Sequence, residues 1–245
     1  MTLYNPVWGR KFLQLALLER QEKATAVADE LALLVQPESL SAMFDEFVEG
    51  TRSALCHHSD SYAHDNGFDK IVLFQDTNTK MKMRLHLWYP RIIAGTKRPR
   101  QNVHNHRWDF SSAVLAGSAE NLSYRFAQPH EEGEEFFHYR YYARGSKEHY
   151  DVEERGRAVL VCTDVQRVVA GDIYSVNHET LHRVDIPDGD FVATLVITHE
   201  NVGWVTNDLL SERSMGFNRT RFSSPAMTQA EIIEKIERLR THMNL

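Results

Sequence analysis

The sequence predicts a mainly β protein, a barrel or sandwich, with helical segments at both ends. Many short apolar or alternating segments lie between residues 67 and 200, separated by glycines such as Gly117, Gly171 and Gly189. This pattern is typical of sandwiches and barrels. Helical periodicity is confined to the two ends of the chain, and the length of 245 residues fits one domain. We expect a single domain over 1–245, with a helical part over 1–60, a β-barrel over 67–200 and a C-terminal extension with a helix over 201–245.

The helical segments have recognisable beginnings and ends. Apolar residues at helical spacing predict one helix over 10–35 and a second that starts at Pro37 and runs through 43–48, with Ser41 contributing to its capped start. At the other end, Thr228 and Glu231 have the form of a capping box and predict a helix over 228–242.

A hairpin is the first predicted β feature. Residues 70–74 are β-rich, a polar turn follows, and residues 80–89 alternate, with Arg84, His86 and Trp88 on the parity opposite to the methionines. The sequence leaves open whether that parity faces the interior or solvent. Further strands are expected at 111–115, 120–126, 135–142, 149–154, 158–161, 172–176 and 191–198.

Composition excludes several classes of function. The formal net charge is -6, and the only dense basic stretch, at residues 97–100, is short, so no nucleic-acid surface is expected. The two cysteines form no metal-binding or disulfide pattern, and Cys162 is expected to be a small buried residue. We find neither a signal peptide nor a membrane span, so no membrane partner and a cytoplasmic location are expected.

Two histidines at alternate positions suggest a metal site. His104 and His106 project to the same face if their segment is a strand, which would let both imidazoles reach one ion. Two half-buried polar histidines are the ordinary alternative. A second segment, from Gly171 to Val184, has a turn, a strand, a polar loop and then His182.

Together these two segments resemble the two cupin motifs. His182 lies at the distance from Gly171 of the histidine in the second motif, and Gly117 lies at the distance from the first two histidines of the glycine that closes the first motif. The resemblance implies a cupin jelly-roll barrel, of the RmlC-like type, that holds a metal ion on His104, His106 and His182.

The chain also departs from the cupin pattern. Phe110 or Ser111 stands at the position of the usual glutamate ligand, and Asn177 and Glu179 replace the proline and glycine of the second motif. A site of three histidines without a carboxylate is similar to that of the thiol dioxygenases. The segment around His182 looks like the one around the third histidine of cysteine dioxygenase.

This resemblance to cysteine dioxygenase implies substrate-binding positions that the chain keeps poorly. The family's arginine for the substrate carboxylate falls near Lys70, its outer-sphere residues fall on Thr194, Val196 and Thr198, and its cross-linking cysteine falls on Ser111. We therefore expect a cysteine-dioxygenase-like enzyme whose substrate is not cysteine.

Three imidazole ligands leave coordination positions for O2 and substrate, which supports Fe(II), while zinc, nickel and manganese remain open alternatives because imidazole suits several metals. We expect O2 and a small anionic or thiol-containing substrate as partners, since three neutral ligands leave the charge of the ion uncompensated. Asn102, Asp109 and Asp185 are candidates to accept the second N–H of the ligand imidazoles.

The remaining candidates concern substrate and catalysis. Lys70, Arg84, Trp88, Thr194 and Val196 are expected to bind the substrate, and Tyr174 and Arg84 to take part in catalysis.

The sequence leaves three features open. His57, His58 and His64 lie in a polar stretch that is a solvated loop, a lid or a second metal site. The aromatic segment 138–142 belongs to the core or to the edge of a homodimer. The alternatives to an oxygenase are a cupin isomerase, lyase or carbon-oxidising enzyme and a ligand-binding cupin without catalysis.

Overall fold

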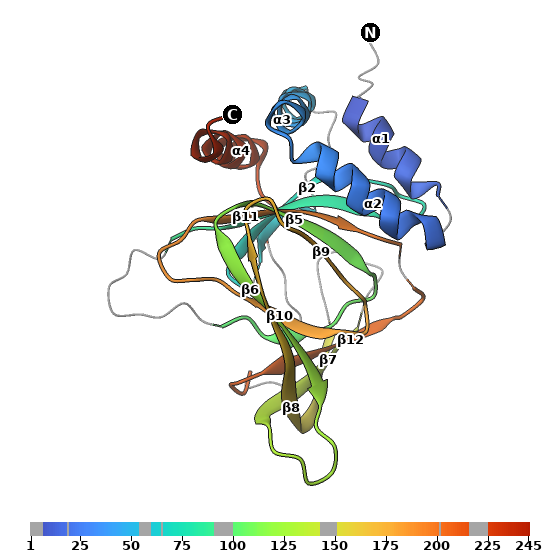
Figure 1. Ribbon diagram of the computed structural model, residues 1–245, viewed down its shortest axis with the longest axis vertical. Helices are drawn as coiled ribbons and strands as arrows, with labels where there is room; N and C mark the ends of the chain where they lie inside the picture. Colours follow the sequence, from blue (N-terminus) through green and yellow to red (C-terminus); the bar gives the residue numbers. More distant parts are fainter. Residues whose placement is uncertain are drawn as a thin grey trace.

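Two antiparallel β-sheets form the body of the protein, with helices on the outer side of one sheet (Figure 1). The computed structural model describes residues 7–18, 20–53, 60–64, 66–90, 100–142, 151–200, 202–215 and 225–245. His57 and His58 lie outside the described residues. In the described part of the chain no helix is long and apolar enough to cross a membrane. The prediction of a mainly β fold with helices at both ends is confirmed.

The helices differ from the sequence prediction at one place. They are α1 (Val7–Ala16), α2 (Arg20–Leu34), α3 (Pro37–Arg52) and α4 (Gln229–Met243). The prediction of one continuous helix over 10–35 is wrong, because the chain leaves the first helix after Ala16. There the N–H groups of Leu17 and Leu18 bond to carbonyls three residues back, at 3.1 and 3.2 Å, which tightens and ends the turn.

The helix starts are only partly as predicted. The second helical segment starts at Pro37 as expected, but Ser41 is not its cap, because Gln36 occupies that position without a side-chain bond. The Ser41 hydroxyl instead accepts a hydrogen bond from Arg240 of α4. The capping box between Thr228 and Glu231 is present as predicted.

The first sheet, sheet A, carries the helices on one face. Its strands lie in the order β1 (Tyr62–His64), β2 (Phe68–Gln75), β3 (Lys82–Trp88), β11 (Val192–Thr198), β5 (Phe110–Ala116) and β9 (Ile173–Val176). Met81, Met83, Leu85 and Leu87 are buried in one cluster with apolar residues of the four helices. The opposite parity of β3 therefore faces the second sheet, which answers the question that the sequence left open.

The second sheet, sheet B, closes on itself. Its strands are β10 (Leu181–Asp185), β4 (Val103–His104), β12 (Thr206–Ser211), β7 (Glu134–Tyr142), β8 (Asp151–Val169) and β6 (Ser118–Phe126), in that spatial order. The orders β3-β11-β5-β9 in sheet A and β4-β10-β6-β8 in sheet B are those of a jelly roll, the cupin architecture. Two strands, β1 and β12, lie outside residues 67–200.

Sheet B has a packed core on each of its faces. Neighbouring residues along its strands alternate between the two: His104 and His182 face sheet A, whereas Val103 and Leu181 belong to a separate buried cluster with Tyr124, Phe136, Leu160 and Leu210. The strands β7, β8 and β12 wrap this second core and project away from the helices (Figure 1). The interior of the jelly roll is thus one of two cores that share sheet B.

The longest strand was predicted as two shorter ones. β8 runs unbroken from Asp151 to Val169, through Gly156, which the sequence indicated as a turn. Gly156 has a φ of 97°, and the β7–β8 register shifts beside it, so this glycine forms a bulge inside a strand. The expectation that Cys162 is buried is also wrong, since its side chain is exposed on this strand.

Candidate metal site

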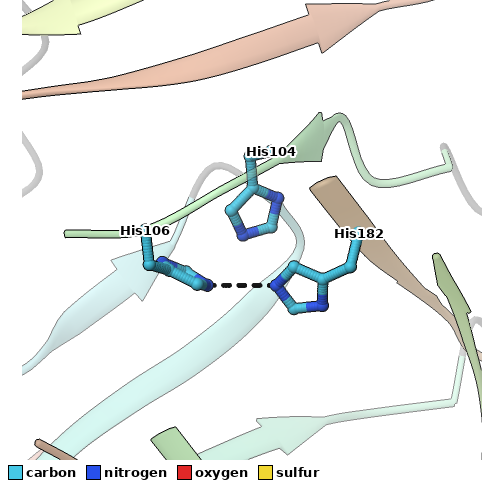
Figure 2. Close-up of side chains that lie close together, drawn as sticks. All are labelled: His104, His106 and His182. Carbon is cyan, nitrogen blue, oxygen red and sulfur yellow. Dashed lines mark hydrogen bonds between the residues drawn. The ribbon is translucent and has the colours of Figure 1, made fainter. Parts of the chain in front are cut away.

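The three predicted metal ligands meet between the two sheets. His104 ends β4 and lies directly opposite His182 of β10. His106 lies two residues beyond the end of β4, so the expectation that one strand carries both His104 and His106 holds for His104 alone. In Figure 2 the three rings converge on one point.

The spacing of the ring nitrogens suits a single ion. Nε2 of His106 lies 3.1 Å from Nε2 of His182, and one nitrogen from each of the three rings falls within 4.8 Å of the others. Two imidazoles bound at about 2.1 Å and at right angles would place their nitrogens roughly 3.0 Å apart. The His106–His182 pair already has this separation, and a small approach of His104 would complete the set.

Two of the rings are oriented by hydrogen bonds from their outer nitrogen. His104 Nδ1 donates to the carbonyl oxygen of Asn102 at 2.9 Å, as the sequence suggested. His182 Nδ1 donates to Oδ1 of Asn121 at 3.2 Å. Each bond fixes the tautomer that leaves Nε2 free to bind a metal ion. Asn121 was missed, because only the pairing of β6 with β10 brings it beside His182.

The two acidic candidates for this role have other partners. Asp109 accepts hydrogen bonds from His178, and Asp185 lies 3.2 Å from Arg183. Arg183 itself lies on the face of sheet B that is turned away from the metal site, with its guanidinium against Tyr124.

Burial keeps the ligand imidazoles neutral. Desolvation lowers the pKa of His104 and holds the pKa values of His106 and His182 well below the ordinary 6.5, with a further contribution from the neighbouring histidines. Metal ions bind deprotonated imidazole. The site is therefore in its ligand form at neutral pH.

A phenyl ring occupies the place where a carboxylate ligand was considered. The ring of Phe110 lies 5.3 Å from that of His106 and 5.5 Å from that of His182. Ser111 points to the other face of sheet A, where its hydroxyl lies 2.8 Å from that of Ser175. Of the described residues, only these three histidines form a group with metal-binding spacing, and no carboxylate belongs to it.

The inner face of sheet A lies across the barrel from His104 and His182. Strand pairing sets Lys70 beside His86, His86 beside Thr194, and Arg84 beside Val196. All the residues predicted for substrate binding and catalysis lie on this face: Lys70, Arg84, Trp88, Tyr174, Thr194 and Val196.

Cations and aromatic rings share that inner face. Lys70 Nζ lies 3.8 Å from the centre of the Tyr62 ring, and the Arg84 guanidinium lies 5.2 Å from that of Trp108. His64, which was expected in a polar loop or a metal site, belongs to β1 and stacks on Phe68 at 4.5 Å. Burial, with Lys70 as the next cause, lowers its pKa to about 3. The positive charges of Lys70 and Arg84 thus act on groups inside the barrel, such as the His64 imidazole.

Two buried nitrogens on β3 have no hydrogen-bond partner among the described residues. They are Nε2 of His86 and Nε1 of Trp88. Leaving a buried polar atom unsatisfied costs about 1–3 kcal/mol. These atoms are therefore available to a molecule that enters the barrel.

One residue of the aromatic segment of β7, Tyr139, belongs to the core. Tyr139 is fully buried with Val152 and Leu209, and its hydroxyl accepts a hydrogen bond from the backbone N–H of Met215. The core alternative is therefore confirmed for Tyr139, and the homodimer edge stays a prediction.

Solved structures similar to this chain share little of its sequence. No protein-family model and no curated protein matches the sequence. Among solved structures, KdgF from a Halomonas species has 11% identity over 58% of this chain and 89% of its own, with a TM-score of 0.32. The DMSP lyase DddQ from Ruegeria pomeroyi has 13% identity over 66% of this chain and 64% of its own, with a TM-score of 0.35. A cupin-2 domain protein from Rhodospirillum rubrum has 9% identity over 75% of this chain and 85% of its own, with a TM-score of 0.33.

The strand order and the site together define the class of protein. The chain is a jelly-roll protein of cupin architecture. Its interior carries three neutral histidines in an arrangement that could bind one metal ion.

Proposed function

We propose that this protein is a mononuclear non-haem iron enzyme that uses O2 to oxidise a small anionic or thiol-containing metabolite. His104, His106 and His182 would hold Fe(II). The observation that carries the proposal is the meeting of three neutral imidazoles inside the barrel, with the ring of Phe110 where a carboxylate ligand would otherwise stand.

The donor set fits such an ion. Three neutral imidazoles would hold the ion without cancelling its charge, and the ion, when bound, would supply O2 activation and affinity for an anionic substrate atom. The protein's own contribution is to hold the rings. Asn121 and the carbonyl of Asn102 fix two of them, and burial keeps all three in the neutral form.

The inner face of sheet A supplies the substrate contacts in this proposal. Lys70 and Arg84 attract the negative charge of the substrate, while Thr194 offers a hydroxyl. Trp88 and Val196 form apolar walls that limit its size. Burial raises the pKa of Tyr174, so its hydroxyl stays protonated and able to donate a hydrogen bond to a developing charge.

The test is an O2-uptake screen of the iron-loaded protein. Tag-free protein is loaded with Fe(II) under anaerobic conditions and mixed with small thiols and small carboxylates in an oxygen electrode. We expect substrate-dependent O2 uptake in the wild type and none in His182→Ala. The matched control is His138→Ala, which removes an imidazole from β7, outside the site.

Two results would contradict the oxygenase. Turnover of a substrate without O2 uptake would make the protein an isomerase or lyase. Ligand binding without turnover, unchanged after removal of the metal, would make it a binding protein.

A further inference from the structure

The three histidines are not held in the same way. His104 and His182 are fixed by strand pairing, each opposite the other. His106 lies outside the strands, and its backbone N–H donates to the carbonyl oxygen of His178 at 3.1 Å. The position of the His106 ring therefore depends on the loop between β9 and β10, which carries His178.

That loop is tied back to the segment that follows His106. Oδ1 of Asp109 accepts the backbone N–H of His178 at 2.7 Å and its ring Nδ1–H at 2.6 Å. Both bonds are short and end on a carboxylate, which makes them stronger than neutral hydrogen bonds. The His178 side chain is 12% exposed, and its ring packs against Trp204 at 4.8 Å. The His178 ring is thus largely shielded from water, while the Asp109 side chain that accepts both bonds is 27% exposed.

These hydrogen bonds and the chain from His106 to Asp109 form a closed ring of contacts, which we call the His178 circuit. Asp109 holds His178, His178 holds His106, and only two residues separate His106 from Asp109. We infer that Asp109 and His178 are positioning residues that set the His106 ring for metal binding. This inference rests on the proposed metal site and assigns the pair no contact with metal or substrate.

If the His178 circuit positions His106, its loss should weaken metal binding selectively, without a matching loss of overall stability. Without Asp109 the paired ligands His104 and His182 stay in place, because strand pairing holds them. The loop that accepts the His106 N–H then loses its tie to the chain after His106, while the backbone bonds of Asn105 to Asp208 and of Val202 to Arg107 remain. Loss of an outer partner of a metal site weakens metal affinity by about 10- to 100-fold. A purely structural residue would lower the melting temperature without changing the geometry of the bound ion.

The experiment is an anaerobic titration with Co(II), followed by the visible absorption bands that report ligand number and geometry. The variants are Asp109→Ala, Asp109→Asn, His178→Ala and His178→Asn. The side-chain amide introduced by His178→Asn can still donate to Asp109, so this variant should restore most of the affinity that His178→Ala loses. Asp109→Asn keeps an acceptor oxygen without its charge and should lie between wild type and Asp109→Ala.

A second histidine–aspartate pair in the chain provides the control. His138 Nε2 lies 2.9 Å from Oδ1 of Asp208, with a similarly buried side chain, on the strands β7 and β12. His138→Ala should leave both Co(II) affinity and spectrum unchanged. Circular dichroism and the melting temperature of each metal-free variant show that it is folded.

The outcomes separate the inference from the proposed function. If the wild type binds no Co(II), the metal site itself fails. If the wild type binds and folded Asp109→Ala binds with the same affinity and spectrum, the positioning role is overturned. If Asp109→Ala does not fold, the pair of His178 variants decides, because equal affinity in His178→Ala and wild type would also overturn it.

Discussion

His104 and His182 are cross-strand partners, directly opposite each other on β4 and β10. Their ring centres lie 4.9 Å apart. β4 has only two paired residues, yet it lies between β10 and β12, because His104 also pairs with Leu209. The fold alone therefore brings two ligands together, and we expect the site to form before any metal binds.

The bond from His182 to Asn121 should matter for metal affinity. Asn121→Leu removes the acceptor for His182 Nδ1 and frees the ring to turn. We expect metal affinity to fall by about tenfold. Isothermal titration with Zn(II) or Co(II) measures it. Arg125→Ala, at an exposed position on the same strand, is the control, and an equal loss in both variants would show that the bond has no specific role.

Acid should destabilise the metal-free protein. His64 has a pKa of about 3 in the folded protein and near 6.5 when unfolded. Above pH 6.5 the His64 imidazole is mostly neutral in both states. Below this pH it is protonated in the unfolded protein and stays neutral in the folded protein. The free energy of unfolding should therefore fall as the pH drops from 6.5, by about 1 kcal/mol for His64 at pH 5.5.

Urea denaturation at pH 7.5 and 5.5 measures this dependence. His64→Phe should show a smaller loss of stability between the two pH values than the wild type. His130→Asn, at an exposed position, should leave the dependence unchanged. An identical dependence in wild type and His64→Phe would contradict the account.

Arg183 should stabilise the second core of sheet B. Its side chain is 2% exposed and lies 3.0 Å from Glu212 and 3.2 Å from Asp185. Arg183→Ala removes the nearer of the two arginines beside Asp185, the other being Arg100 at 3.8 Å, and opens space beside Tyr124. We therefore expect a loss of about 3 kcal/mol in the free energy of unfolding. Chemical denaturation tests this. Arg155→Ala, at an exposed pair, should have no measurable effect, and an equally small effect at Arg183 would be contrary to expectation.

Gly117 should tolerate no side chain. Its φ is 75°, and an added Cβ would lie 2.3 Å from the carbonyl oxygen of Phe191. Gly117→Ala should therefore cost more than about 2 kcal/mol. Gly67 has a φ of 80° with open space around it, so Gly67→Ala adds only the conformational cost. Thermal unfolding of the two variants should show a clearly larger loss for Gly117→Ala.

The sequence predicted those parts of the fold that depend on local pattern. The alternation in 80–89 gave the correct hairpin, and the capping box at Thr228 gave the start of α4. The sequence was wrong where tertiary contacts decide. Gly156 resembles a turn residue, but the pairing of β7 with β8 carries the strand through it as a bulge.

In the candidate site, too, the sequence predicted some residues, whereas tertiary contacts place the others. The alternate positions of His104 and His106, together with the resemblance of their segment and of the His182 segment to the cupin motifs, predicted a shared metal site, and the structure brings the three histidines together. Asn121 and His178 could not be predicted, because they reach the histidines only through strand register and a loop connection. Nothing in the local sequence marks either of them.

The most direct test of the account is the amount of metal bound per chain. Tag-free wild-type protein and His182→Ala, both loaded anaerobically with Fe(II) and desalted, are analysed for iron. We expect about one iron per chain in the wild type and almost none in the variant. Absence of metal from both proteins would contradict the central claim that the three histidines form a metal centre.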